Sequence, residues 1–242
     1  MLYLHRQKAR TLKIGLCFLI GLVSLTQTSV AQERELNLYD HDFKPYYFGL
    51  TLGINSSRFH PQMHPRFLQD DSVLTAEPMN SMGLNLGLLA TARISDRFQL
   101  RFNPQLIFTE RKIVYHLTTP EDGKTEITQS LNPIIVSFPV QVKLQSDRIG
   151  NFRVYMMAGF KADLTLSGNK KSDGTIQIKG SDFGPELGIG FNFFLKSFIF
   201  SPELKISNGL PNIHSRDASV KYSSVFDKIQ SRMIMLSFHF EG

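Results

Sequence analysis

The sequence predicts an all-β protein: an eight-stranded antiparallel up-and-down transmembrane β-barrel with a filled polar lumen. Stretches of about ten residues alternate between apolar and polar side chains, which is the period of a β-strand. An export signal precedes these stretches, and no later run of about 20 apolar residues could form a spanning helix. The 242 residues include 20 Phe and 7 Tyr, a composition that suits strands.

The first 31 residues have the form of a secretory signal peptide. Basic residues precede an apolar run from residue 14 to residue 25. As a helix this run would rise only about 18 Å, which is too short for a hydrocarbon core of about 30 Å. The small-x-small sequence before Gln32 predicts cleavage after Ala31. The expected organisation is a cleaved signal (1–31), a periplasmic N-terminal arm (32–45) and an outer-membrane barrel (46–242).

The charge and cysteine content exclude two classes of soluble protein. The whole chain carries 27 Lys and Arg against 21 Asp and Glu. Four of the basic residues and none of the acidic ones lie in the signal, so the mature chain has 23 against 21. That small excess argues against nucleic-acid binding. Cys17, the only cysteine, also lies in the signal. A disulfide-stabilised secreted domain is therefore excluded, and a bilayer would supply the missing stability.

Eight stretches carry the alternation. They are residues 48–55, 84–91, 98–109, 134–144, 152–163, 186–193, 198–207 and 234–240. Short connections alternate with long polar ones. The short ones are 95–97, 146–151 and 195–197, and the long ones lie near 56–81, 112–129, 167–181 and 208–230. In an up-and-down barrel, the short connections and both termini then share one rim. Short periplasmic turns opposite long external loops are typical of outer-membrane barrels.

The composition of the two faces favours a membrane barrel over a lipocalin. A lipocalin would place the apolar face inside, where so many Phe side chains would be crowded. We therefore expect the apolar face to meet lipid and the polar face to fill the lumen. The charged residues expected in the lumen are Arg101, Lys143, Arg153, Lys161, Glu186, Glu203 and Lys205. We expect the first three to pair with Glu186 or Glu203.

Four prolines oppose this interpretation. Pro104, Pro139, Pro185 and Pro202 lie within expected strands. Proline donates no ladder hydrogen bond and usually marks an edge or a bulge. Because a closed barrel has no edges, we expect bulges or broken strands at these positions.

No motif predicts catalysis, a metal or a cofactor. Gly188-Ile189-Gly190 lacks the third glycine and the helix of a dinucleotide fingerprint. His60 and His64 have a metal-ligand spacing on a helix, but flanking prolines oppose a helix and no third ligand is evident. His214, Ser215 and Asp217 neighbour one another on one loop, which rarely gives the geometry of a triad. We expect no enzyme activity, no cofactor and no small-molecule substrate.

The central and C-terminal stretches resemble the PorT family of outer-membrane barrels from Bacteroidetes-type bacteria. The resemblance covers the chain from about Tyr46 to its end. The segments that carry it are Asn132–Val140, Arg148–Phe152, Glu186–Phe191, Ser201–Lys205 and Ser207–Leu210. Pro139 and Pro202 lie within these segments, and Pro185 directly precedes one of them. The resemblance implies a role in type IX secretion of cargo proteins such as proteases or, in gliding relatives, motility adhesins, and it carries over no catalytic residue.

Two classes of function remain open at this point. The first is a subunit or accessory factor of a secretion machine, in contact with outer-membrane lipid and other secretion proteins. The second is a stand-alone small pore or a barrel enzyme. A filled lumen favours the first, because cargo cannot pass through eight strands. The acidic arm before the barrel is either a partner contact or a disordered tail.

Overall fold

The computed structural model describes residues 35–63, 73–121, 124–167, 177–178, 180–215 and 226–242. The chain divides into two units, residues 1–35 and 36–242, and the second contains every element below. The predicted cleavage point at Ala31 and Gln32 lies outside the described residues. Within the described residues, no helix has the length and hydropathy needed to cross a bilayer.

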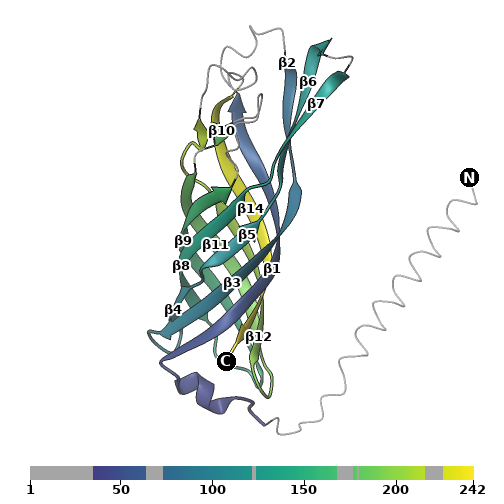
Figure 1. Cartoon of the computed structure of the whole chain (residues 1–242). Helices are drawn as coiled ribbons and strands as arrows, with labels where there is room; N and C mark the ends of the chain where they lie inside the picture. The colour runs from purple at the N-terminus through teal and green to yellow at the C-terminus, as the bar shows by residue number, and fades with distance from the viewer. Residues whose placement is uncertain (1–34, 64–72, 122–123, 168–176, 179, 216–225) are drawn as a thin grey trace, which may run out of the picture. The chain divides into compact units, whose positions relative to one another are not determined.

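Eight strand positions close into one antiparallel ring, as predicted (Figure 1). The strands are β1 (Tyr46–Met63), β3 (Ser81–Arg93), β4 (Phe98–Phe102) with β5 (Gln105–Phe108), β8 (Ile134–Gln145), β9 (Phe152–Ser167), β11 (Ser181–Phe194), β12 (Ile199–Asn208) and β14 (Phe226–Glu241). β1 pairs with β14 on one side and with β3 on the other, which closes the ring. β4 and β5 share one position, because both pair with β3 and with β8.

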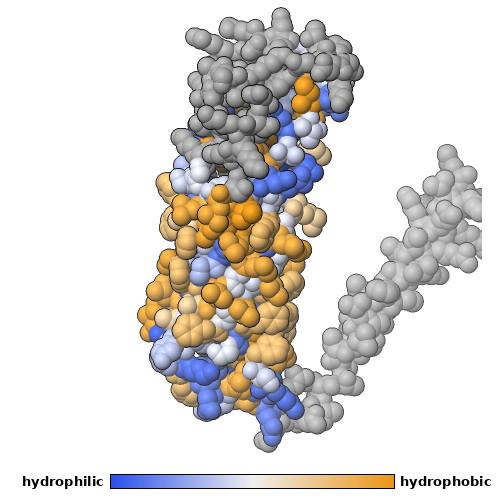
Figure 2. All heavy atoms as spheres, in the orientation of Figure 1, coloured by the Kyte–Doolittle hydropathy of each residue, from blue (hydrophilic) through white to orange (hydrophobic). Residues whose placement is uncertain are grey.

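The apolar face of the strands points outward. Leu50 is 56% exposed, Leu187 is 64% exposed, and similar residues of the other strands are exposed as well. On the face shown in Figure 2, these side chains form an apolar belt over the middle of the barrel. Phenylalanines of β9, β11, β12 and β14 contact one another within it, for example Phe200 and Phe238, whose ring centroids lie 5.9 Å apart. The belt excludes the lipocalin arrangement, because an exposed apolar surface of this extent requires lipid.

Only one of the four prolines breaks a strand. Pro104 lies in the gap between β4 and β5, where its carbonyl still accepts a hydrogen bond from Leu88 N–H. Pro139 and Pro185 lie inside continuous strands with no register shift beside them, although the ladder from β8 to β4 and β5 is interrupted at Pro139. At Pro202 the strand continues, but the ladder between β11 and β12 is interrupted. The expectation of a break or bulge at every proline is therefore wrong for Pro139 and Pro185.

The connections divide between two rims, as predicted. The short-turn rim carries residues 94–97, 146–151 and 195–198, and the chain enters and leaves the ring there. Gly150 adopts a φ of 59° in the second of these turns, a conformation that a side chain disfavours. Before β1, residues Tyr39–Phe43 form a short 3-10 helix, η1, at the same rim (Figure 1).

The opposite, long-connection rim holds strands that the sequence interpretation assigned to loops. They are β2 (Val73–Met79), β6 (Arg111–Glu121), β7 (Lys124–Leu131), β10 (Gln177–Ile178) and β13 (His214–Ser215). β2, β6 and β7 form a three-stranded sheet that continues beyond the barrel wall (Figure 1). The upper ends of β1 and β14 also continue, paired as far as Met63 and Phe226. The long connections are therefore partly ordered β-structure.

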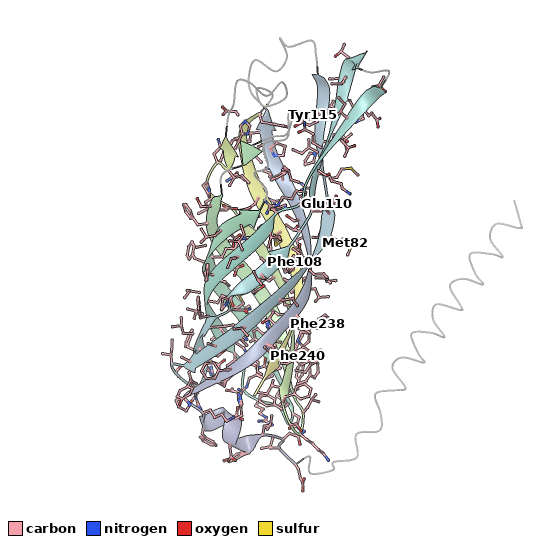
Figure 3. The ribbon with its side chains drawn as sticks, in the orientation of Figure 1. Met82, Phe108, Glu110, Tyr115, Phe238 and Phe240 are labelled. Atoms are coloured by element: carbon pink, nitrogen blue, oxygen red, sulfur yellow. The ribbon has the colours of Figure 1, made fainter. Side chains whose placement is uncertain are left out.

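An apolar cluster forms the core of this extension. Its buried residues are Phe59, Ala76, Ile113, Tyr115, Leu131, Ile213, Phe226 and Ile229. Figure 3 shows Tyr115 near the long-connection end, far from Phe238 and Phe240 of β14. Ile113, Tyr115 and Leu117 recur at every second position, a strand signal that was obscured by the apolar Val114 between them and by the polar residues of the rest of the segment. The cluster packs the three-stranded sheet against the extended ends of β1 and β14.

Candidate functional site

A buried charge network fills the lumen near the short-turn rim. Arg101 Nη1 donates to Glu203 Oε2 at 2.7 Å, and Nη2 donates to Glu241 Oε1 at 3.2 Å. Lys143 Nζ lies 4.0 Å from the other oxygen of Glu241. All four side chains are fully buried. Two cations and two carboxylates therefore balance one another where water is excluded, which is the condition for burying charge.

Tyr155 and His239 complete this network. Tyr155 donates its hydroxyl to Glu203 Oε2 at 2.9 Å, and its ring lies 4.0 Å from Lys143 Nζ. His239 Nε2 lies 3.4 Å from Glu203 Oε1. Gly190 makes room for Tyr155, because a Cβ at that position would overlap the tyrosine ring. At this level of the barrel, large side chains occupy the space that a channel would need.

Two further ionic groups lie toward the long-connection rim. Glu186 lies 3.6 Å from Lys205 Nζ and accepts a hydrogen bond from Gln141 Nε2 at 2.8 Å. Lys161 donates to Asp163 at 2.5 Å. Beside them, inward-facing apolar side chains form a separate layer made of Ile107, Ile135, Met233 and Met235. The lumen thus consists of charged and apolar layers rather than of a uniformly polar interior.

The predicted lumen charges divide into six that are buried and one that is not. Arg101, Lys143, Lys161, Glu186, Glu203 and Lys205 are all 3% exposed or less. Arg153 is only half-buried, and its partner is Asp42 before the barrel, at 3.1 Å. The expected pairing of Arg153 with Glu186 or Glu203 is therefore wrong, because its strand position places it at the rim.

The partner of Lys143 also differs from the expected one. Lys143 pairs with Glu241 rather than with Glu186 or Glu203. Glu241 was not among the predicted lumen charges, although it continues the polar face of the last strand after Ser237 and His239. The alternation extended by two residues would have found it.

Residues 36–44, which we call the docked arm, fold against the short-turn rim. Asp42 Oδ2 accepts from Arg148 Nη1 at 2.9 Å, and the guanidinium of Arg148 stacks 3.7 Å from the ring centroid of Phe194. Asn37 N–H donates to Asn151 Oδ1 and Asn37 Nδ2 donates to Phe194 O, both at 2.9 Å. The carbonyl of Asn37 also accepts from Arg148. This part of the arm is therefore ordered against the barrel and is not a disordered tail.

His41 is the inward-facing residue of the docked arm. Its ring lies 4.4 Å from that of Tyr47, and its side chain is 7% exposed. Burial lowers the pKa of His41 below its ordinary value of 6.5. The carboxylates of Glu241 and Asp42 oppose this shift, whereas Lys44 and Lys143 reinforce it. The docked arm therefore favours a neutral imidazole.

A cavity of about 280 Å³ remains between the docked arm and the barrel, which we call the mouth cavity. Its lining includes His41, Asp42, Gln145, Arg148 and Arg153. Neither His41 Nε2 nor Gln145 Oε1 has a hydrogen-bond partner among the described residues. The mouth cavity is thus lined by charged and unsatisfied polar groups and opens at the short-turn rim.

The motifs considered for chemistry do not assemble into a site within the described chain. Gly188 and Gly190 lie in β11, on the side of the strand that faces the lumen. His214 and Ser215 form β13, whereas Asp217 lies outside the described residues. His60 lies in β1, and His64 lies outside the described residues. No group of three potential metal ligands is close enough to hold an ion in the part of the chain that is described.

Solved structures that are similar to this chain share little sequence identity with it. Among solved structures, the chain is similar to neisserial surface protein A, with 12% identity over 80% of this chain and 96% of that one and a TM-score of 0.40. OprG from Pseudomonas aeruginosa is 13% identical over 80% and 95%, with a TM-score of 0.43. Ail from Yersinia pestis is 13% identical over 82% and 100%, with a TM-score of 0.37. No curated protein sequence matches the chain.

One protein family accounts for most of the sequence. Residues 30–215 match the family described as outer membrane protein beta-barrel domain. The closed ring and the outward apolar belt are what a barrel in that membrane requires. The chain is therefore an integral outer-membrane protein and belongs to the outer membrane protein beta-barrel domain family.

Proposed function

We propose that this protein is a non-catalytic subunit or accessory factor of the type IX secretion machinery, and that it acts through contacts at its rims. Its cargo would be secreted proteases or motility adhesins, as the resemblance to the PorT family implies. Its partners would be outer-membrane lipid and other proteins of the secretion system. In this proposal the short-turn rim and both termini face the periplasm, and the long-connection rim faces outward.

The filled lumen is the observation that carries the proposal. Arg101, Lys143, Glu203 and Tyr155 are each no more than 2% exposed and occupy the lumen together. The apolar cluster lies at one end of the barrel, and the docked arm contacts the rim at the other. A lumen that large side chains occupy, within the described residues, supports a role through the surfaces of the barrel rather than through transport of a solute. The step from surfaces to type IX secretion rests on the PorT resemblance.

A deletion strain tests this proposal against a stand-alone pore and against a barrel enzyme. We expect loss of cargo export, measured as protease activity or adhesin in the medium, with solute uptake and surface lipids unchanged. Slower uptake with normal export would indicate a pore. Normal export and uptake with altered surface lipid or peptide would indicate an enzyme. Normal cargo export in the deletion strain contradicts the proposal.

Point variants add a control within the same strain background. Glu77 is exposed on β2, and its replacement by Gln should restore export fully when that variant is supplied to the deletion strain. A variant without the docked arm's ion pairs, Asp42→Asn, should still insert in the outer membrane, because the ring closes through β1 and β14 and not through the arm. Membrane fractionation of each variant separates a secretion defect from failure to assemble.

A further inference from the structure

The docked arm is bound as a peptide ligand would be. At one end, Arg148 and Arg153 contact the carboxylate of Asp42 at 2.9 and 3.1 Å. At the other end, the backbone and side chain of Asn37 form hydrogen bonds with Asn151, with the carbonyl of Phe194 and with Arg148. Paired arginines facing a carboxylate are a common way to recognise an acidic group. Hydrogen bonds to backbone groups recognise the polypeptide segment to which the acidic side chain belongs.

The arm nevertheless fits this surface incompletely. It leaves the mouth cavity of about 280 Å³, and it leaves His41 Nε2 and Gln145 Oε1 without partners among the described residues. Leu38, which precedes η1, has a φ of 50°, a left-handed conformation that a residue with a Cβ disfavours. Buried polar groups without partners and an unfavourable backbone both weaken the docking.

The apolar side chains of the arm contribute little to its docking. Leu36, Tyr39 and Phe43 are 47%, 57% and 64% exposed, and the last two contact each other at 5.2 Å between ring centroids. Because apolar burial is the main source of binding energy, a segment held mostly by ion pairs and hydrogen bonds is weakly held. A competing segment that also filled the mouth cavity would bind more tightly.

We propose that the docked arm is a displaceable internal ligand and that its site is a receptor for an acidic segment of a periplasmic partner protein, folded into a short turn as the arm is. The partner's carboxylate takes the place of Asp42 between Arg148 and Arg153. Its backbone takes the place of Asn37, five residues earlier, against Asn151 and Phe194. This inference rests on the proposed function, which places the short-turn rim in the periplasm and gives the protein partners there.

A segment of a protein fits this site better than a free small carboxylate. A free carboxylate would satisfy only the two arginines, whereas Asn151 and the carbonyl of Phe194 recognise amide groups at the far end. The side chains that line the mouth cavity carry both signs of charge, with Lys44, Arg93, Arg148 and Arg153 against three aspartates. The small positive excess adds to the preference for an acidic ligand.

Peptide binding to the purified full-length mature protein tests the inference. The probe is a fluorescently labelled peptide with the sequence of residues 36–44, acetylated and amidated so that it carries no terminal charges. The release variant is Asn37→Ala/Asp42→Asn, which removes the internal contacts at both ends. By anisotropy we expect the release variant to bind the probe about tenfold or more tightly than the unmodified protein, because the internal ligand no longer competes.

Matched variants show whether the arginines and the carboxylate at position 42 contribute to binding of the probe. Asp40→Asn removes an acid of η1 that is exposed, and it should bind the probe as the unmodified protein does. Adding Arg153→Gln to the release variant should weaken binding about tenfold, and Arg153→Lys should restore part of it. A probe with Asn in place of Asp42 should also bind about tenfold more weakly.

Hydrogen exchange shows whether the docked arm is released in each variant. Amides of residues 37–44 should exchange faster in the release variant than in Asp40→Asn. Unchanged exchange would mean that these contacts do not hold the arm, and it would overturn the inference. So would faster exchange without probe binding, or binding that Arg153→Gln leaves unaffected. A dimer of the unmodified protein joined through exchanged arms would show that the occupant is a second copy and not another protein.

The outcomes for this inference and for the proposed function are independent. Peptide binding is measured on purified protein, whereas secretion is measured in the deletion strain. Absence of probe binding together with loss of cargo export would retain the secretion role and reject the receptor. Probe binding together with normal export would retain the receptor and reject the secretion role.

Discussion

Loss of Glu203 is the sharpest test of the lumen network. In Glu203→Leu, Arg101 keeps Glu241 at 3.2 Å but loses the closer carboxylate at 2.7 Å. Tyr155 loses the acceptor of its hydroxyl, and His239 loses a carboxylate at 3.4 Å. The substitution leaves two cations, Arg101 and Lys143, to share the one remaining carboxylate of this network.

The free energy of unfolding should fall by about 4 kcal/mol. Breaking a buried ion pair by removing one partner costs about 3–5 kcal/mol, and the middle of this range applies because Arg101 keeps Glu241 whereas the Tyr155 hydroxyl loses its acceptor. Leu is close to Glu in volume, so no large cavity adds to this cost. With a urea m value of about 2–3 kcal/mol/M, the midpoint should shift by about 1.3–2 M. Arg101→Leu/Glu203→Leu should recover about half of the loss, because it removes both charges.

Urea titration of the barrel in lipid vesicles measures this loss. The folded fraction can be followed by the different gel migration of unheated folded and unfolded protein. Glu77→Leu, on the exposed face of β2, serves as the control and should change stability by no more than about 0.5 kcal/mol. A midpoint for Glu203→Leu within about 0.3 M of the unmodified protein would refute the reasoning. So would a double variant that is less stable than the single one.

Four further measurements follow from the sequence and the structure. Intact mass should show a mature chain that begins at Gln32 in the outer-membrane fraction, and an inner-membrane pool that retains the signal would contradict this. Glu186→Leu leaves Lys205 without its carboxylate at 3.6 Å and should lower the unfolding temperature in gels. An unchanged unfolding temperature would contradict this pairing. The pKa of His41 is lowered when the arm is docked, so below about pH 6.5 the undocked arm binds more protons than the docked arm. Docking therefore weakens as the pH falls below that value. Hydrogen exchange of the arm, corrected for intrinsic rates, should rise between pH 7.5 and 5, and His41→Phe should abolish the change. Ile113→Ala should loosen the three-stranded sheet by about 2–5 kcal/mol and leave the barrel folded, as limited proteolysis can show.

The number and orientation of the barrel strands could be predicted from the sequence. Side chains of a strand alternate between its two faces, so the series Phe48, Leu50, Leu52 must share one face. Lipid accepts only apolar groups, and an eight-stranded lumen accepts small and paired polar ones, so the alternation also indicated which face is outside. The same reasoning placed Arg101 and Glu203 inside the barrel.

The pairing of those charges could be decided only by the tertiary structure. Arg101 lies on β4, whereas its partners Glu203 and Glu241 lie on β12 and β14, which are not neighbours of β4 in the ring. Which side chains meet across a lumen depends on how far each strand is staggered against the next around the whole ring. That stagger results from many hydrogen-bond registers together, and no local sequence pattern contains it.

The docked arm and the three-stranded sheet of β2, β6 and β7 also could not be predicted without the tertiary structure. Asp42 meets Arg148 across 106 positions of sequence, and no periodicity links them. Ile113 and Tyr115 carried a strand pattern, but most other residues of 112–129 are polar enough to resemble a loop. A short alternating segment becomes a strand only when a neighbouring strand satisfies its backbone and a common core buries its apolar side. Both conditions arise only once the barrel has brought β1, β6 and β14 together.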